Sequence, residues 1–159
     1  MVRDDVLVYH LQHGRGANFG YAGGPQEDHW AVIEEAVEAR PYRLAVSPAR
    51  NFLNTTFNNT PTSLAKEGRP SLMIHPDDAA ATGIAEGDLV AVGNDRGRVR
   101  LHARLFDGLR RGVLVAEGIW PNGAHVDGEG INVLTGADPV APYGGAAVHD
   151  NSVWLAKAT

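Results

Sequence analysis

The residues best suited to hold a ligand are the asparagines and threonines that gather between Pro48 and Asn59. Their side chains donate and accept hydrogen bonds without carrying a charge, which is the chemistry needed to bind the polar edge of a flat heterocycle. The same residue types also fill turns by hydrogen bonding to their own backbone. Composition alone favours the turn interpretation, and the binding interpretation needs support from other parts of the chain.

Three other groups of residues could carry chemistry, and in each the pattern favours a structural role. His10 and His13 are three residues apart, but their surroundings are typical of a strand and a loop rather than a metal-binding helix face. The glycines over residues 14–20 are spaced G-x-G-x-x-x-G, one residue off the dinucleotide fingerprint, and no βαβ unit with its acidic residue follows. His149 has no serine, cysteine or carboxylate pair placed to act with it.

Composition and charge narrow the class of protein. The chain has 159 residues, of which 43% are hydrophobic and 21% charged, and it contains 19 glycines and 9 prolines. These values indicate a globular domain that is rich in turns. A formal net charge of −5 disfavours a nucleic-acid surface, which needs a basic face. The charge does not exclude a phosphorylated cofactor, because backbone N–H groups can hold phosphate.

The chain contains no cysteine, which excludes disulfides, thiol catalysis and iron–sulfur ligation by its own side chains. No apolar run reaches the length of a membrane span, and the N-terminus lacks the charged and then apolar layout of a signal peptide. We therefore expect no nucleic-acid partner and no membrane insertion, and we expect the isolated chain to be cytoplasmic.

The elements that would position a site are clearest over residues 74–101. Pro76 predicts the start of a short helix over residues 77–81, with its acidic side chains in the first turn, where they oppose the helix dipole. Gly83 is placed to end that helix in a left-handed conformation. Alternating apolar residues then predict a strand, a hairpin turn over residues 94–97 and a returning strand. A strand, short helix and hairpin in this order are typical of a β-barrel.

The remainder of the chain predicts more strands and one longer helix. Residues 25–40 have an amphipathic pattern that predicts a helix with Trp30 and Ile33 on its apolar face. Other predicted elements are strands over 5–11, 42–47, 71–75, 99–105, 113–116 and 152–156, and a helical turn over 62–67. The sequence therefore divides into an N-terminal loop and helix appendage, residues 1–40, and a β-barrel domain, residues 41–159.

Three motifs in a fixed order carry a family resemblance. They are the stretch from Pro76 to Gly97, the F-L-N-T-T-F run over residues 52–57, and the N-x-L-T segment over residues 132–135. Together they resemble the C-terminal molybdopterin dinucleotide-binding domain of molybdenum and tungsten oxidoreductases, the relatives of formate dehydrogenase, nitrate reductase and dimethyl sulfoxide reductase. Residues 118–122 are similar to a strand of that family that ends in a tryptophan. The resemblance covers residues 41–157.

The resemblance implies a mainly β fold, a double-psi β-barrel with a few short helices, to which the N-terminal amphipathic helix is added. It also implies binding of molybdopterin guanine dinucleotide (bis-MGD), whose molybdenum or tungsten would be bound elsewhere in the parent oxidoreductase. In the family, the loop after the first strand lines the pterin, and the N-x-L-T turn contributes to pterin and guanine binding. The implied cofactor-binding residues are Ser47, Asn51, Phe52, Asn54, Thr55, Thr56, Trp120, Asn132, Thr135, Asp138, Gly144 and Gly145.

The chain departs from the parent enzymes because it has no cysteine and no room for the domains that hold the metal. We therefore expect a C-terminal domain with no catalytic or metal-ligating residue, inactive alone, whose partners are the remaining domains or the catalytic subunit of the parent oxidoreductase. Two alternatives stay open. One is a separately encoded, cofactor-binding small subunit that docks through Trp30 and Ile33. The other is a cofactor-free double-psi barrel interaction module, like those of some AAA ATPases.

Overall fold

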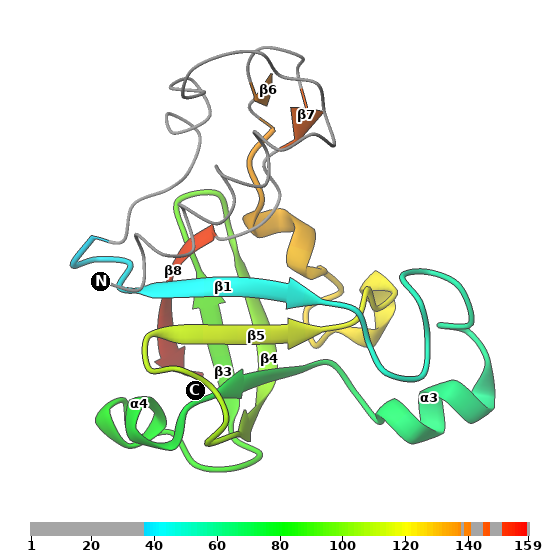
Figure 1. The fold of residues 1–159 in the computed structure, drawn as a ribbon, viewed down its shortest axis with the longest axis horizontal. Coiled ribbons are helices and arrows are strands. Elements are labelled where there is room, and N and C mark those ends of the chain that lie inside the picture. Colours follow the sequence, from blue (N-terminus) through cyan, green and yellow to red (C-terminus); the bar gives the residue numbers. More distant parts are fainter. Residues whose placement is uncertain (1–36, 138, 141–144, 147–150, 159) are drawn as a thin grey trace, which may run out of the picture.

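The computed structural model describes residues 37–137, 139–140, 145–146 and 151–158. Six strands in this part of the chain form a closed barrel in the order β1-β5-β2-β4-β3-β8, and a small pair of strands, β6 and β7, lies outside it (Figure 1). The barrel strands are β1 (Tyr42–Ser47), β2 (Ser71–Ile74), β3 (Leu89–Gly93), β4 (Arg98–Leu105), β5 (Val113–Glu117) and β8 (Asn151–Lys157). The other elements are α3 (Pro61–Glu67), α4 (Pro76–Ala81), the 3₁₀ helices η1 (Asn122–Ala124) and η2 (Ile131–Leu134), β6 (Pro139–Val140) and β7 (Gly145–Ala146).

The strand pairing of the barrel has a two-fold pattern. One parallel pair joins β1 to β5 and a second joins β2 to β4. These two pairs meet where β5 lies antiparallel to β2, and β8 and β3 close the ring antiparallel to each other. Each half therefore contributes one parallel pair and one further antiparallel strand, as expected for a double-psi barrel. The predicted fold class, mainly β with a closed barrel and short helices, is confirmed.

Alternation of side chains explains why these segments form a barrel around one core. In β4, Val99, Leu101 and Ala103 point inward and are buried, whereas the residues between them are exposed or half-buried. Leu44, Leu72 and Leu114, from three other strands, have no exposed area. This period of two is the pattern that one buried and one wet face impose on a strand.

The short helix α4 begins and ends as its sequence predicts. His75 caps its N-terminus, where Nδ1 accepts a hydrogen bond from the Asp77 N–H at 3.1 Å. At the C-terminus, Gly83 adopts a φ of 68°, and the N–H of Ile84 donates to the Ala79 carbonyl at 2.8 Å. This is a Schellman-type ending, and it turns the buried Ile84 side chain back into the core.

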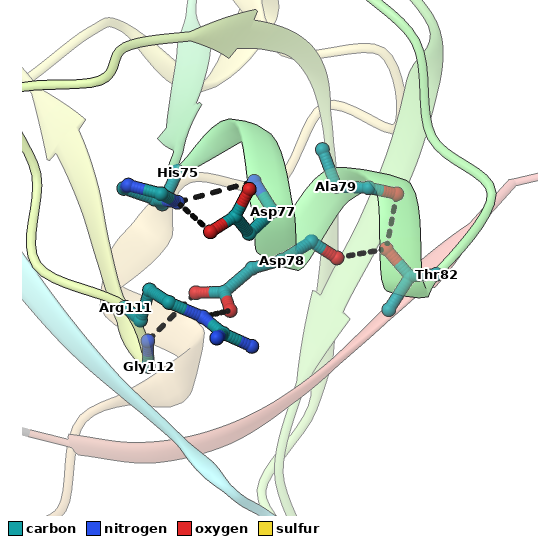
Figure 2. A network of polar contacts seen from close by, with 7 residues as sticks. All are labelled: His75, Asp77, Asp78, Ala79, Thr82, Arg111 and Gly112. Atoms are coloured by element: carbon teal, nitrogen blue, oxygen red, sulfur yellow. Dashed lines mark hydrogen bonds and ion pairs between the residues drawn. The ribbon is translucent and has the colours of Figure 1, made fainter.

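A buried carboxylate attaches α4 to the rest of the barrel. Asp78 accepts a hydrogen bond from the N–H of Gly112 at 2.6 Å and lies 3.4 Å from Nε of Arg111 (Figure 2). Gly112 directly precedes β5, so this contact fixes α4 beside the start of that strand. The sequence predicted only a helix-dipole role for the acidic residues of α4, whereas Asp78 also makes this tertiary contact.

Two sequence predictions about element boundaries are wrong. The predicted helix over residues 25–40 does not reach its end, because residues 37–40 form a turn in which the N–H of Arg40 donates to the Val37 carbonyl at 2.8 Å. Pro41 disfavours helical geometry at Arg40, and the Arg40 carbonyl instead accepts a hydrogen bond from Oγ of Ser152. Residues 25–36 of this prediction, with Trp30 and Ile33, lie outside the described residues, as does the predicted strand over 5–11.

The second concerns residues 118–122, which the family resemblance likens to a strand ending in a tryptophan and which do not form a strand. β5 ends at Glu117, because Gly118 adopts a φ of 84° and leaves the strand geometry. A Cβ at Gly118 would lie 2.9 Å from both the Cβ of Ala49 and a ring carbon of Phe52. Glycine is therefore required there both by its backbone conformation and by the close approach of the loop that follows β1.

Candidate ligand-binding cleft

A cleft of about 220 Å³ lies at one edge of the barrel. Because β1 and β5 are parallel, their carboxyl ends meet at the same edge, and the segments that follow them form two of the cleft walls. The turn around η2 forms the third wall. The lining residues are Thr55, Asn58, Ile119, Trp120, Pro121, Asn122, His125, Gly130, Ile131 and Asn132.

The loop after β1 is held in a tight and partly strained shape. Leu53 and Thr56 pair through backbone hydrogen bonds of 3.1 and 2.8 Å. Asn54 and Phe57 have positive φ values of 49° and 68°, which asparagine tolerates well and phenylalanine does not. Nδ2 of Asn58 then donates to the Ile119 carbonyl at 3.2 Å and joins this loop to the segment after β5. Strained backbone of this kind is common at ligand-binding loops.

A small apolar cluster packs around Trp120, one of the lining residues. Phe52 and Trp120 are both buried, and their rings meet edge to face with centroids 5.0 Å apart. Nε1 of Trp120 donates to the Glu117 carbonyl at 3.0 Å, so the indole is held at both its apolar and its polar side. Ala49 and Leu64 complete the cluster. The cluster therefore joins the loop that follows β1 to the segment that follows β5.

The hairpin turn between β3 and β4 holds η2 in place. Asn94 is buried, and its Nδ2 donates to the Leu134 carbonyl at 2.8 Å. Its Oδ1 accepts a hydrogen bond from the N–H of Arg96, which stabilises the turn itself. Because η2 carries Asn132 into the cleft, the position of that side chain depends on the hairpin.

His125 is the titratable residue of the cleft lining, and it is buried. Its side chain is 8% exposed, and burial holds its pKa below the ordinary value of 6.5. The segment around it is anchored, because Asp127 forms an ion pair with Arg100 in which Nε of Arg100 lies 2.8 Å from Oδ2. Nδ1 of His125 is buried and has no hydrogen-bond partner among the described residues. A buried polar atom in this state calls for an explanation.

The structure brings three of the predicted cofactor-binding residues together. Thr55, Trp120 and Asn132 come from three separate segments and line the same cleft. Phe52 lies beneath it in contact with Trp120. Thr135 follows Asn132 and uses its Oγ1 to donate to the Asn132 carbonyl at 2.8 Å, so it shapes the turn.

The other predicted residues that the structure describes are not among the lining residues. Nδ2 of Asn51 donates to Oε1 of Glu67 at 2.8 Å and so joins the loop to α3. The Ser47 carbonyl accepts a hydrogen bond from the Gly118 N–H at the end of β1. Asn54 and Thr56 are exposed residues of the loop after β1. Gly145 lies in β7. Asp138 and Gly144 are outside the described residues. Cofactor contact by the predicted residues stays a prediction.

Sequence reasoning missed several residues of the cleft, notably Asn58, Asn122 and His125. Asn58 lies in the asparagine-rich loop but beyond the F-L-N-T-T-F run. Asn122 ends the segment 118–122 that is similar to a strand of the family, and His125 lies in the polar, glycine-rich stretch over residues 123–130, whose composition predicts a loop. The signal available was its polar composition beside a tryptophan and proline, but only the fold shows which of these side chains is buried.

None of the helices described is long and apolar enough to cross a membrane. No group of three or more histidine and acidic side chains in the described ranges could together hold a metal ion.

Comparisons with known proteins agree on one family. Residues 42–153 match the family model described as "Molydopterin dinucleotide binding domain". Dimethyl sulfoxide/trimethylamine N-oxide reductase of Rhodobacter capsulatus is 35% identical over 108 residues, which is 64% of this chain and 13% of that protein. Dimethyl sulfoxide reductase DmsA of Escherichia coli is 34% identical over 121 residues, covering 74% of this chain and 15% of that protein. The chain thus spans less than a fifth of the length of these relatives.

A solved structure shares the fold. Acetylene hydratase from Pelobacter acetylenicus superposes with a TM-score of 0.63 at 14% sequence identity, over 75% of this chain and 18% of that protein. At this identity the superposition is informative about the fold alone.

Proposed function

The chain belongs to the molybdopterin dinucleotide-binding domain family of the dimethyl sulfoxide reductase group of oxidoreductases, and from this premise we propose that its cleft binds part of a molybdopterin guanine dinucleotide. The observation that carries the proposal is the meeting of Thr55 and Asn132 in one cleft. These residues come from two motifs about 77 positions apart in the sequence, and the barrel places both at the same edge.

The chemistry of the lining fits the heterocyclic part of such a cofactor. Every side chain of the lining is uncharged at neutral pH, because burial keeps His125 in its neutral form. Thr55, Asn58 and Asn132 can donate and accept hydrogen bonds along a ring edge. A phosphate group would be better matched by cations or by a row of backbone N–H groups.

The size of the cleft supports the same assignment. Pockets that enclose a drug-sized ligand have volumes of about 300–1,000 Å³. A volume of about 220 Å³ suits one ring system and not a whole dinucleotide. We infer that the remaining parts of the cofactor contact other loops of this chain and other domains.

Catalysis is proposed to belong to a larger assembly. When bound, the cofactor supplies the redox chemistry through its metal and dithiolene sulfurs, while the protein supplies binding and orientation. This chain would act as the C-terminal cofactor-binding domain of a molybdenum or tungsten oxidoreductase, with bis-MGD as its cofactor. Its partners would be the remaining domains or the catalytic subunit.

Binding by the 159-residue chain tests the role of the cleft. We expect guanosine monophosphate (GMP) or the free pterin neopterin to quench the tryptophan fluorescence of the chain on titration, because Trp120 is one of its three tryptophans and lines the cleft. Substituting Thr55 or Asn132 with alanine should weaken that binding about five- to tenfold, which corresponds to about one hydrogen bond. Asn59→Ala is the matched control, because Asn59 is an exposed asparagine of the same loop that does not line the cleft. Absence of binding by the unmodified chain would overturn the proposal.

The native polypeptide tests the larger assembly. Antibody detection in the source cells gives its mass, and metal analysis of the co-purified material shows what it carries. A chain several times longer that carries molybdenum or tungsten supports the C-terminal domain. A chain of this length in a metal-containing complex supports a separately encoded small subunit. A chain of this length with neither metal nor pterin contradicts the function and leaves a cofactor-free interaction module.

A further inference from the structure

His125 has a buried ring nitrogen without a hydrogen-bond partner among the described residues, and filling space in the core does not explain why a histidine is present there. The ring lines the cleft, yet Nδ1 is fully covered and has no hydrogen-bond partner among the described residues. A protein that needed only to fill this volume would be served by an apolar ring, which has no polar atom to desolvate. Histidine at this position therefore suggests that its other nitrogen has a function.

The buried Nδ1 determines where the proton of the neutral ring resides. A neutral imidazole carries one N–H donor and one acceptor nitrogen. A buried N–H without an acceptor costs about 1–3 kcal/mol, so the proton is disfavoured at Nδ1 and favoured at Nε2. The same cost opposes double protonation, in agreement with the lowered pKa of His125. His125 is therefore a neutral ring that presents an N–H donor at Nε2.

Nε2 lies close to Gly130, a residue of the cleft wall. A Cβ at Gly130 would lie 3.6 Å from Nε2 of His125 and 2.8 Å from Oδ1 of Asn122. Gly130 and Asn122 are themselves lining residues, so the donor belongs to the wall that they form. The neighbouring Asn and Thr side chains can adapt as donors or acceptors, whereas the neutral His125 ring offers a donor alone at Nε2.

We propose that His125 is a specificity-determining residue whose Nε2–H donates to the carbonyl oxygen of an uncharged oxo-pyrimidine ring, the ring that guanine and pterin share. This inference rests on the proposed function and adds a fixed selection rule to it. A ring with an amino group in place of the oxo group, as in adenine, would place a donor against the donor at Nε2 and be rejected.

Three variants of the full chain test the rule. His125→Phe keeps a ring of similar shape and removes the donor, and His125→Gln restores an N–H donor that reaches about as far as Nε2. Asn59→Ala again serves as the unaffected control. Each is titrated with GMP, neopterin and adenosine monophosphate (AMP), and thermal unfolding establishes that each is folded.

We expect the unmodified chain to prefer GMP or neopterin over AMP about tenfold or more. In His125→Phe the affinity for the oxo ring should fall about five- to tenfold and the preference over AMP should largely disappear. His125→Gln should recover most of both. In ¹⁵N NMR spectra of the free chain, the His125 proton should reside on Nε2, and that resonance should shift when the probe binds.

The outcomes separate this inference from the proposed function. Failure of the unmodified chain to bind GMP and neopterin overturns both. Binding that is unchanged in strength and in preference in His125→Phe overturns the role of His125 and leaves the proposed function intact. A proton found on Nδ1 of the free chain overturns the inference directly, whatever the affinities are.

Discussion

At the scale of single residues, buried polar groups define how this barrel is held together. Asp78 is 6% exposed and accepts a hydrogen bond from the Gly112 N–H, whereas its neighbour Asp77 is exposed on the same first turn of α4. Sequence treats the two as equivalent, because both could oppose the helix dipole. The fold distinguishes them by giving only Asp78 a backbone donor from another segment.

This difference predicts unequal effects of two identical substitutions. Asp78→Asn should lower the free energy of unfolding by about 1–3 kcal/mol, because it weakens a hydrogen bond to a charged acceptor inside the structure. Asp77→Asn should cost no more than about 1 kcal/mol, the usual size of a dipole interaction at a surface. Urea unfolding of both variants measures the difference. Equal losses would show that the contact with Gly112 adds little.

His125 predicts a pH dependence of stability with a definite sign. Its folded pKa lies below 6.5, so as the pH falls below that value the unfolded chain binds the proton more readily than the folded chain. The free energy of unfolding should therefore decrease until the pH passes below the folded pKa. His125→Phe lacks this contribution and should gain stability relative to the unmodified chain as the pH is lowered.

Unfolding curves at a series of pH values check this prediction. His102 also has a lowered pKa, through burial and the charge of Arg69, and it stays present in His125→Phe. His102→Gln is thus the matched control, and it should change the pH dependence separately. A constant difference between His125→Phe and the unmodified chain at every pH would contradict the prediction.

At the scale of elements, the β3–β4 hairpin supports the cleft although it contributes no lining residue. Nδ2 of Asn94, in the turn of this hairpin, donates a hydrogen bond to the carbonyl of Leu134 at the end of η2, and η2 carries Asn132 into the cleft lining. The sequence predicted the turn over residues 94–97 from its residue types. It did not predict this contact, because a link between residues 94 and 134 arises only from the closed barrel.

Asn94→Asp separates the two bonds made by this side chain. The variant keeps Oδ1 as acceptor for the Arg96 N–H but replaces the donor to Leu134 with a second oxygen. We expect a loss of about 1–3 kcal/mol in the free energy of unfolding and faster amide hydrogen exchange over residues 131–135. Asn94→Ala, which removes both bonds, should show the same faster exchange. Unchanged exchange in both variants would mean that the hairpin does not hold η2.

Strands could be predicted well because each needs only local information. The alternation of apolar and polar residues placed β1 and β4 within one residue of their observed bounds. Boundaries failed where another segment decides them, as at Gly118, whose geometry is set by Ala49 and Phe52. The family resemblance located Thr55 and Asn132, but not His125, because its burial depends on how three distant segments come together.

At the scale of the whole molecule, the six strands of the barrel bond to one another as a closed ring. All of them lie beyond residue 41, and the division of the chain into residues 1–40 and 41–159 stays a prediction. Every described contact of the cleft also lies within this part.

Deletion of residues 1–36 tests that division. The shortened chain keeps the turn over residues 37–40 and the bond between Arg40 and Ser152. We expect its urea midpoint and slope to equal those of the full chain, because the barrel strands lose none of their described partners. Circular dichroism and size exclusion report whether it is folded and monodisperse. A lower midpoint would show that the first 36 residues stabilise the barrel.

The closing strand β8 has a consequence for how the chain is made in the cell. It lies between β1 and β3, yet it is synthesised after all five other barrel strands. Until β8 has left the ribosome, β1 and β3 have open edges that invite pairing with other chains. Closure must then bring together partners more than 100 residues apart in β1 and β8, as Leu44 and Asn151 are, which slows folding. The barrel therefore closes only after β8 has been synthesised, and the edges of β1 and β3 are open to pairing with other chains until then.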